Sequence, residues 1–435
     1  MTAAPHTLAD WLATLEARHA AAPIQLGLER VRAVWQRLAG ESPRLPPIFT
    51  VAGTNGKGST CAMLDAILRA AGQHIARYSS PHLLDYTERV CIDGVPADAA
   101  TLAAAYAAVE AARGDTPLTY FEHGTLAAWH YFLHPPVGTP VPEVWVLEVG
   151  MGGRLDAVNI LDADCAIVTS VALDHTDFLG ADREAIGREK SGIFRAQRPA
   201  ICGDAQPPES LIAHAQQVGA PLWVLGQDFG FENEGIQWRY WRRSAPGGAG
   251  INKRGGLAHP ALRGAHQLIN AAIALTALDT LRERLPCPMQ AVRQGLMQVQ
   301  LAGRFQTLPG RPTIVLDVAH NPQAARVLAQ ALGQTFSPHT RAVFAMLADK
   351  DIDGVIQAIA PRIDHWHVAP LPGPRGLDGE RLANAVRAHS NAPVEVAESA
   401  AAAFAQAREA IGDNDRIVAF GSFLTVAEVL RTLQP

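Results

Sequence analysis

Apolar positions along the chain follow two spacings, one typical of helices and one typical of buried strands. Between residues 8 and 40 they recur at helical spacing, which predicts two helices around a break at 22–27. The runs 144–149 and 165–171 are almost continuously apolar, as expected for strands buried on both faces. Because such strands alternate with helical segments along the chain, the pattern predicts an α/β fold with mainly parallel sheets.

Length and composition predict two domains. The 435 residues exceed what one hydrophobic core normally serves. A cluster of short chain-breaking residues at 301–305 precedes a further series of strands and helices. We therefore expect an N-terminal domain over 1–302 and a smaller Rossmann-like α/β domain over 303–435. Residues 243–260 are rich in glycine, and their composition predicts a mobile loop.

The segment 47–72 reads as strand, glycine-rich turn and helix, and it carries the clearest chemical signal. Its turn, GTNGKGST, covers residues 53–60. Glycines let successive backbone N–H groups converge on an anion, and the helix that follows adds the positive end of its dipole. Lys57 supplies a mobile cation, and Ser59 or Thr60 supplies a hydroxyl for a phosphate-bound Mg²⁺. The segment therefore predicts a phosphate-binding loop.

This turn departs from the usual pattern G-x-x-x-x-G-K-[ST]. Val51 stands where the first glycine would be, and Gly58 separates Lys57 from the hydroxyls. A glycine-rich connection without chemical role is the alternative. The flanking strand and helix favour the phosphate loop, because they are the structural context that such a loop requires.

Polar side chains follow three other predicted strands. Ser79 and Ser80 come after the strand 74–78, Glu148 lies near the end of the second strand, and His175 follows the third. Ligands of open α/β sheets bind beyond the carboxyl ends of the strands. A buried carboxylate requires a cation, so Glu148 indicates a metal ion or, as the alternative, an ion pair with arginine. His175 is a candidate Mg²⁺ ligand or phosphate contact.

The residues alone do not decide the roles of two further segments. Tyr120 and Phe121 begin a helix, and they either pack in the core or stack on a flat ligand, with core packing favoured. The run Arg188-Glu189-Lys190 is typical of a solvated helix face.

Charge and cysteine content exclude several classes of function. The formal net charge is −5 and there is no block of Lys or Arg, so we expect neither nucleic acid nor a membrane surface as a partner. The five cysteines are scattered and show no metal-binding spacing. The N-terminus lacks the basic region of a signal peptide, so we expect a cytoplasmic protein that acts on small molecules.

Eight short segments, in order over nearly the whole chain, carry a resemblance to a known family. They are GTNGKGS (53–59), SSPHL (79–83), YTERV (86–90), EVGMGGRLD (148–156), DHTDFLG (174–180), REKSGIFR (188–195), GRF (303–305) and DVAHNP (317–322). In these segments the chain resembles the folylpolyglutamate synthase family, the folate branch of the Mur ligase superfamily, in its bacterial bifunctional form.

The resemblance implies an ATP- and Mg²⁺-dependent ligase that joins L-glutamate to dihydropteroate or to reduced folates through an acyl phosphate. It also implies site residues. Those expected at the nucleotide are Thr54, Asn55, Gly56, Lys57, Gly58, Ser59, Asn270, Arg304, Asp317 and, near the phosphates, His320. Those expected at two Mg²⁺ ions are Ser80, Glu148 and His175, beside a carbamylated Lys190. Those expected at the pterin pocket are Leu26, Gly27, Thr119, Tyr120, Phe121, Glu122, Leu155, Asp156 and Ala157.

Several alternatives stay open from sequence. A monofunctional folylpolyglutamate synthase fits the same motifs. A Mur-type peptidoglycan ligase would use the same ATP chemistry, but the phosphate loop begins only about fifty residues into the chain, which leaves no room for an additional N-terminal nucleotide-binding domain. A P-loop GTPase is disfavoured because the guanine signature Asn-Lys-x-Asp is absent from the sequence. A folate-binding module without catalysis would not need metal ligands. We expect a monomer.

Overall fold

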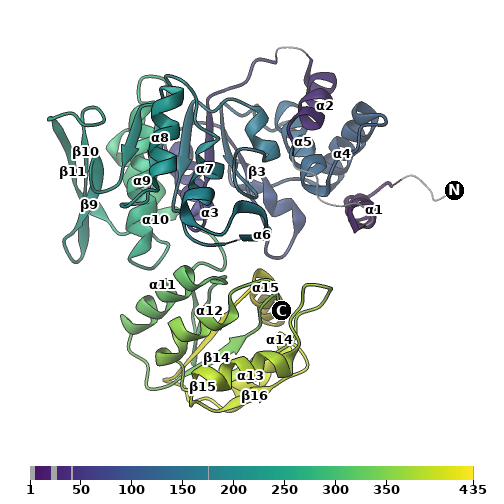
Figure 1. Cartoon of the computed structure of the whole chain (residues 1–435), viewed down its shortest axis with the longest axis vertical. Coiled ribbons are helices and arrows are strands. Elements are labelled where there is room, and N and C mark those ends of the chain that lie inside the picture. The colour runs from purple at the N-terminus through teal and green to yellow at the C-terminus, as the bar shows by residue number, and fades with distance from the viewer. Residues whose placement is uncertain (1–4, 21–26, 41–42, 175, 435) are drawn as a thin grey trace. The chain divides into compact units, whose positions relative to one another are not determined.

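The computed structural model describes residues 5–20, 27–40, 43–174 and 176–434. The chain folds into two compact units, each with its own sheet (Figure 1). The first unit comprises residues 1–260 and 269–299, and the second comprises 261–268 and 300–435. The division lies next to the expected boundary between 302 and 303, except that residues 261–268 group with the second unit.

The first unit is built on a mainly parallel sheet, as the apolar runs predict. The described strands follow the order β4-β3-β2-β5-β1-β6-β7-β8, and β3 and β4 form an antiparallel edge. Their bounds are β1 Ile48–Ala52, β2 Ile75–Tyr78, β3 Val90–Ile92, β4 Val95–Pro96, β5 Val144–Glu148, β6 Cys165–Val168, β7 Ala200–Cys202 and β8 Leu222–Val224. The central strands β1, β5 and β6 are buried throughout, because helices cover both faces of a parallel sheet.

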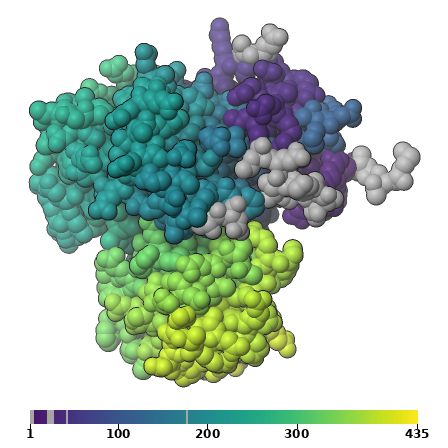
Figure 2. Space-filling model, viewed as in Figure 1, coloured from purple at the N-terminus to yellow at the C-terminus, as the bar shows by residue number. Residues whose placement is uncertain are grey.

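Helices account for most of the remaining chain up to residue 298. They are α1 Leu8–Ala20, α2 Glu29–Ala39, α3 Lys57–Ala70, α4 Ala99–Arg113, α5 Tyr120–Leu133, α6 Thr176–Leu179, α7 Arg183–Ser191, α8 Glu209–Val218, α9 His266–Thr280 and α10 Met289–Gln298, with short 3₁₀ helices η1 Tyr86–Arg89 and η2 Ala157–Ile160. Helices α1, α2, α4 and α5 pack on one another and supply the purple and blue surface in Figure 2. Trp35 and Trp129 meet edge to face in their core, with ring centroids 5.2 Å apart.

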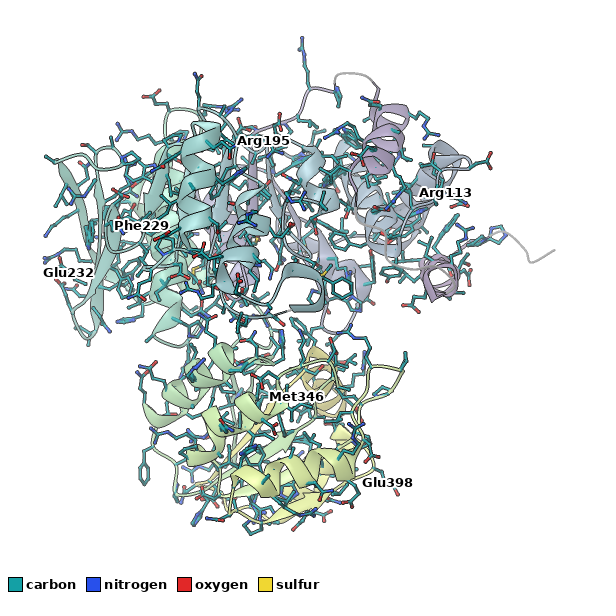
Figure 3. The ribbon with its side chains drawn as sticks, viewed as in Figure 1. Arg113, Arg195, Phe229, Glu232, Met346 and Glu398 are labelled. Carbon is teal, nitrogen blue, oxygen red and sulfur yellow. The ribbon has the colours of Figure 1, made fainter. Side chains whose placement is uncertain are left out.

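The prediction of a mobile loop over 243–260 is wrong. Strands β9 Phe229–Asn233, β10 Gln237–Arg243 and β11 Ile251–Ala258 form a separate antiparallel sheet. Gly247 lies in the hairpin turn between β10 and β11, where it has φ +68° and donates its N–H to Asp228 (2.8 Å). Composition alone misses such a strand, because cross-strand pairing rather than residue type decides it. Figure 3 shows Phe229, which is buried, and Glu232, which is exposed, on β9 of this sheet.

The second unit contains a six-stranded sheet in the order β12-β13-β17-β14-β15-β16, parallel except for the edge strand β12. Its elements are β12 Gln306–Leu308, β13 Thr313–Leu316, α11 Pro322–Gly333, β14 Thr340–Phe344, α12 Ile352–Ile359, η3 Ala360–Arg362, β15 His365–Val368, α13 Gly379–His389, β16 Val394–Val396, α14 Ala400–Glu409, β17 Arg416–Phe420 and α15 Phe423–Leu433. The aromatic rings of Phe344, Trp366 and Phe420 pack in its core, and Met346 is buried near them (Figure 3). The expected α/β architecture with a second, smaller α/β unit is confirmed.

Within the described part of the chain, no helix has the length and apolar character needed to cross a membrane.

Close packing of α10 on α3 gives a test of this architecture. A Cβ atom added at Gly295 would lie 2.5 Å from the backbone Cα of Ile67, so Gly295→Ala must push the two helices apart. Overpacking costs about 1–3 kcal/mol, more than the gain of about 1 kcal/mol in helix propensity. We expect a lower free energy of unfolding in urea. Gln298→Ala, on the exposed side of α10, serves as the control, and equal stability of the two variants would contradict the close approach.

Candidate active site

The turn between β1 and α3 depends on two glycines. Gly53 and Gly56 have φ of +146° and +89°, which other residues rarely adopt. A Cβ atom on Gly53 would overlap the hydroxyl of Thr169, and one on Gly56 would lie 2.6 Å from Oδ1 of Asn270. Helix α3 then begins at Lys57, so its first N–H groups lie directly after the turn. The predicted strand, turn and helix are present.

Residues after β6 hold this loop in place. Thr54 donates its N–H to the carbonyl of Ser170 (2.9 Å), and its hydroxyl exchanges hydrogen bonds with the backbone of Ala172 (3.1 and 3.0 Å). The hydroxyls of Thr169 and Ser170 donate to the carbonyl of Asn55 (2.6 and 3.0 Å). Our sequence reasoning missed these two residues. Their signal is a pair of hydroxyl side chains directly after a buried parallel strand.

Lys57 folds back over the loop that precedes it. Its Nζ donates to the carbonyls of Gly53 (2.9 Å) and Thr54 (3.3 Å). Gly58 and Ser59 are buried in the first turn of α3. The ammonium group and the helix N-terminus therefore concentrate positive charge at one loop, which is the arrangement that binds phosphate.

Glu148 and Ser80 lie together at the ends of neighbouring strands. Glu148 is 4% exposed and its Oε2 accepts a hydrogen bond from the backbone N–H of Ser80 (3.2 Å). Strand pairing places Glu148 opposite Val51, directly before the phosphate loop. Arg77 on β2 forms its ion pair with Asp65 (3.6 Å). A carboxylate and a serine are oxygen donors of the kind that Mg²⁺ prefers, so these residues fit the expected ion.

Lys190 is buried, contrary to the solvated face that its neighbours indicate. Its side chain on α7 is 3% exposed, whereas Arg188 is exposed. Burial and, to a smaller extent, the charge of Lys57 lower the pKa of Lys190 to about 7, although Asp174 opposes the shift. The expectation of a buried lysine with a lowered pKa is confirmed. His175 lies outside the described residues, so its role as a metal ligand stays a prediction.

Asp156 shapes the turn that follows β5. Its carboxylate accepts hydrogen bonds from the backbone N–H groups of Gly150 (3.1 Å), Met151 (3.0 Å) and Val158 (3.0 Å). Burial raises its pKa to about 6 although these hydrogen bonds oppose the shift. Its contact with substrate stays a prediction, as do those of its neighbours, the partly exposed Leu155 and the buried Ala157.

The N-terminus of α5 is fixed by a capping box. Thr119 Oγ1 accepts from the N–H of Glu122 (3.2 Å), and Glu122 accepts from the N–H of Thr119 (2.8 Å). Arg30 on α2 also forms an ion pair with Glu122 (2.8 Å). The carboxylate of Glu122 and the hydroxyl of Thr119 therefore both have partners within the protein. Our sequence reasoning did not find Arg30.

Tyr120 and Phe121 pack against the core while staying partly exposed. The ring of Phe121 lies over Gly150, where an added Cβ atom would be 2.5 Å from Cζ, and its centroid is 6.0 Å from that of Tyr78. Phe121 therefore borders the turn after Glu148. Gly27 is described, with φ +158°, whereas Leu26 lies outside the described residues.

The second unit brings three expected nucleotide contacts together beyond β13. Asp317 accepts from the N–H groups of Phe305 and Ala319 (both 2.8 Å). Burial raises the pKa of Asp317, and the charge of Arg304 opposes that shift. The guanidinium of Arg304 lies over the ring of Phe423, 5.1 Å from its centroid, and His320 lies beside the same ring.

The structure thus assembles the expected residues in two groups. In the first unit they lie at the carboxyl edge of β1, β2, β5 and β6, at the point where strand order reverses around β1. Asn270 on α9 joins this group through its contact with Gly56. In the second unit they lie beyond β13.

Comparison with known families and proteins agrees with this geometry. The Mur ligase middle domain family matches residues 137–278, and the family "Mur ligase, glutamate ligase domain" matches residues 303–423. The dihydrofolate synthase/folylpolyglutamate synthase of Escherichia coli (strain K12) is 43% identical over 436 residues, covering 98% of this chain and 95% of that protein. The protein of the same name from Haemophilus influenzae is 38% identical and covers 97% of this chain and 96% of its own.

Solved structures give the same result. E. coli FolC in complex with DHPP and ADP has a TM-score of 0.90 at 42% identity, covering 99% of both chains. A bifunctional folylpolyglutamate synthase/dihydrofolate synthase with Mn, AMPPNP and L-glutamate bound has a TM-score of 0.87 at 44% identity, covering 98% of both. The chain therefore belongs to the dihydrofolate synthase/folylpolyglutamate synthase family of ATP-dependent Mur ligases.

Proposed function

We propose that this protein is an ATP- and Mg²⁺-dependent ligase that adds L-glutamate to dihydropteroate, giving dihydrofolate, and to tetrahydrofolate polyglutamates. The observation that carries the proposal is the clustering of the phosphate loop, Glu148 with Ser80, and Lys190 at one sheet edge. The likeness to the bifunctional enzymes over nearly the whole chain supports it.

The chemistry consists of two displacements. The carboxylate of the acceptor attacks the γ-phosphorus of ATP, forming an acyl phosphate and releasing ADP. The amine of glutamate then attacks the acyl carbon, and collapse of the tetrahedral intermediate forms the amide and expels phosphate. Both steps move negative charge on phosphoryl oxygens, so catalysis depends on positioning and on charge neutralisation.

The first unit supplies those cations and dipoles. Lys57 would move from the loop carbonyls to the transferring phosphoryl group, and Gly56 and the first residues of α3 would present backbone N–H groups to the phosphates. Thr54 and Asn55, whose N–H groups donate to Ser170, would hold the loop in shape around the phosphates. Glu148 and Ser80 would hold one Mg²⁺, which would supply positive charge to neutralise the phosphate oxygens. In the second unit Arg304, Asp317 and His320 would contact the nucleotide, as would Asn270 in the first.

The acceptor pocket follows from the segments around β5 and α5. The partly exposed rings of Tyr120 and Phe121 would stack on the flat pterin. Thr119, Glu122 and Asp156 are bound to backbone groups, so their contribution would be to hold the pocket wall rather than to recognise the pterin. Gly27, Leu155 and Ala157 would complete it.

Lys190 would act as a carbamate. Carbamylation joins a neutral amine to carbon dioxide and releases one proton, so it requires a lysine whose pKa is close to the working pH. Lys190 meets this requirement, because its pKa is about 7. The resulting anion would attract the neighbouring Lys57 and could orient a second Mg²⁺ beside His175.

We also infer that the enzyme works as a cytoplasmic monomer on small molecules, without nucleic acid or membrane. All five cysteines are described and none forms a disulfide. Light scattering measures the mass in solution, and a value well above 46.4 kDa would contradict the monomer.

Bifunctionality predicts ADP release with either acceptor. We expect purified enzyme to release ADP with dihydropteroate plus glutamate and with tetrahydrofolate plus glutamate, and each acceptor to inhibit turnover of the other because one pocket binds both. Lys57→Ala serves as the background, with kcat lowered at least about tenfold since phosphate clamps are worth several kcal/mol. ADP release with tetrahydrofolate plus glutamate, but not with dihydropteroate plus glutamate, would indicate a monofunctional folylpolyglutamate synthase.

The metal role of Glu148 predicts an altered Mg²⁺ titration. Glu148→Gln keeps the size of the side chain but removes its charge, so we expect about tenfold more Mg²⁺ for half-maximal activity. The control is Glu143→Gln, an exposed carboxylate five residues earlier in the same segment. If the Mg²⁺ titration curves of the two variants coincide, Glu148 has a structural role and does not bind the metal.

Burial of Lys190 predicts a pH-dependent stability. The fold lowers its pKa from 10.5 to about 7, so the unfolded chain binds more protons between these values. The cost of burying the cation is therefore complete below pH 7 and is relieved as pH rises. In buffer freed of carbon dioxide, the free energy of unfolding of the wild type should rise relative to Lys190→Met by about 1 kcal/mol per unit between pH 8 and 9.

Two controls complete this experiment. Lys253→Met, at a half-exposed lysine, should follow the wild type across the pH range. Added bicarbonate should stabilise the wild type but not Lys190→Met, because the carbamate forms only on the native lysine. A parallel response of both proteins to bicarbonate would rule out carbamylation at Lys190.

A further inference from the structure

Two histidines and a glutamate meet on one face of the sheet in the second unit. His365 and His367 lie two residues apart on β15, so both side chains project from the same face. Glu395 on the edge strand β16 pairs directly with His367 (Figure 1 shows the two strands side by side). Nε2 of His365 is 3.0 Å from Oε1 of Glu395, and Nδ1 of His367 is 3.4 Å from Oε2.

His367 is an unusual residue for this position. Its side chain is 0% exposed, yet its Nδ1 makes no hydrogen bond to any residue that the structure describes. A buried ring nitrogen that faces a carboxylate without a hydrogen bond to it is placed as a second ligand of one ion would be.

Each remaining group around the ring comes from a neighbouring element. On β14, Nη1 of Arg341 lies 3.3 Å from Nε2 of His367. On α14, Gln406 contacts the same ring. The rings of His365 and His367 stack, with centroids 4.7 Å apart. Glu395 is half exposed, His365 and Arg341 are partly exposed, and Gln406 is exposed, so solvent reaches the cluster around the buried ring of His367.

We propose that His365, His367 and Glu395 bind one divalent transition-metal ion, with Zn²⁺ as the best fit. One nitrogen from each ring and one carboxylate oxygen lie within 4.8 Å of one another. Ligands about 2.0–2.1 Å from a tetrahedral Zn²⁺ are separated by roughly 3.4 Å, close to the two distances above. Imidazole nitrogen favours Zn²⁺, Ni²⁺ or Co²⁺ over Mg²⁺, so the site is chemically distinct from the one expected at Glu148.

Such an ion would join β15 to the edge strand β16. The strands share a short ladder of three residue pairs, and β16 is only partly buried. Solvent access on the side of His365 leaves room for water as the fourth ligand. The metal would therefore stabilise the free edge of this sheet.

Arg341 opposes the ion in the present arrangement. A metal bound to Nδ1 of His367 requires the proton on Nε2, which would then face the N–H donor of Arg341. The guanidinium must turn away when the ion binds. Replacing it with glutamine removes the positive charge and provides an oxygen that can accept from Nε2–H.

The experiment measures Zn²⁺ affinity on the full-length, chelator-treated protein in excess Mg²⁺, by competition with a chromophoric indicator. The proposal expects one Zn²⁺ per wild-type chain, bound at least tenfold more weakly by His365→Ala and by Glu395→Gln, both at partly exposed positions. His389→Ala is the matched control, because His389 also pairs with a carboxylate, Asp353 (3.0 Å), but has no second histidine beside it. It should bind Zn²⁺ as the wild type does.

Arg341→Gln provides a test that loss of structure cannot imitate. We expect it to bind Zn²⁺ at least threefold more tightly than the wild type, and Zn²⁺ to raise its Tm more than it raises that of His365→Ala. Equal Zn²⁺ affinity of the wild type, His365→Ala and Glu395→Gln would overturn the proposal. Zn²⁺ affinity of Arg341→Gln at or below that of the wild type would overturn it as well, and leave the three residues as a hydrogen-bonded cluster.

Discussion

The contact between the phosphate loop and the end of β6 is the interaction on which the arrangement of the site residues in the first unit depends. The loop contains two glycines with positive φ and few side chains, so it has little means of holding its own shape. Thr169 and Ser170 compensate by binding the backbone of Asn55. Since β5 and β6 flank β1, the same strand order also places Glu148 beside the loop. A rigid anion site follows from sheet topology.

Burial of charge is the second organising constraint. Glu148, Asp156 and Lys190 are all below 10% exposed, and each ionised group loses solvation there. The surroundings of these three buried groups differ. Asp156 accepts hydrogen bonds from three backbone N–H groups, and Glu148 accepts a hydrogen bond from the N–H of Ser80. Lys190 lies near the cation of Lys57, and its own pKa falls to about 7. The proposed roles of Glu148 at Mg²⁺ and of Lys190 as a carbamate would each offset part of this loss of solvation.

The second unit uses the same sheet principle with different chemistry. Beyond β13, Asp317 and Arg304 are held by backbone and aromatic contacts suited to a nucleotide. Near the opposite edge of the sheet, β15 carries the ring nitrogens of His365 and His367, and β16 carries the carboxylate of Glu395. Oxygen donors at Glu148 and nitrogen donors at His365 and His367 would allow one chain to hold two kinds of metal ion without competition between them.

The sequence by itself determined the strands β1, β5 and β6, the phosphate loop and the α/β class, because periodicity and glycine spacing are local signals. It also led to the family through its motifs. Tertiary structure alone decided that 251–258 is a strand, since pairing with β10 outweighs composition. It likewise decided that Lys190 is buried near Lys57, and that Arg30 of α2 forms an ion pair with Glu122. These outcomes depend on contacts between segments that are far apart in the sequence, and the pattern of residues along the chain does not show which segments come into contact.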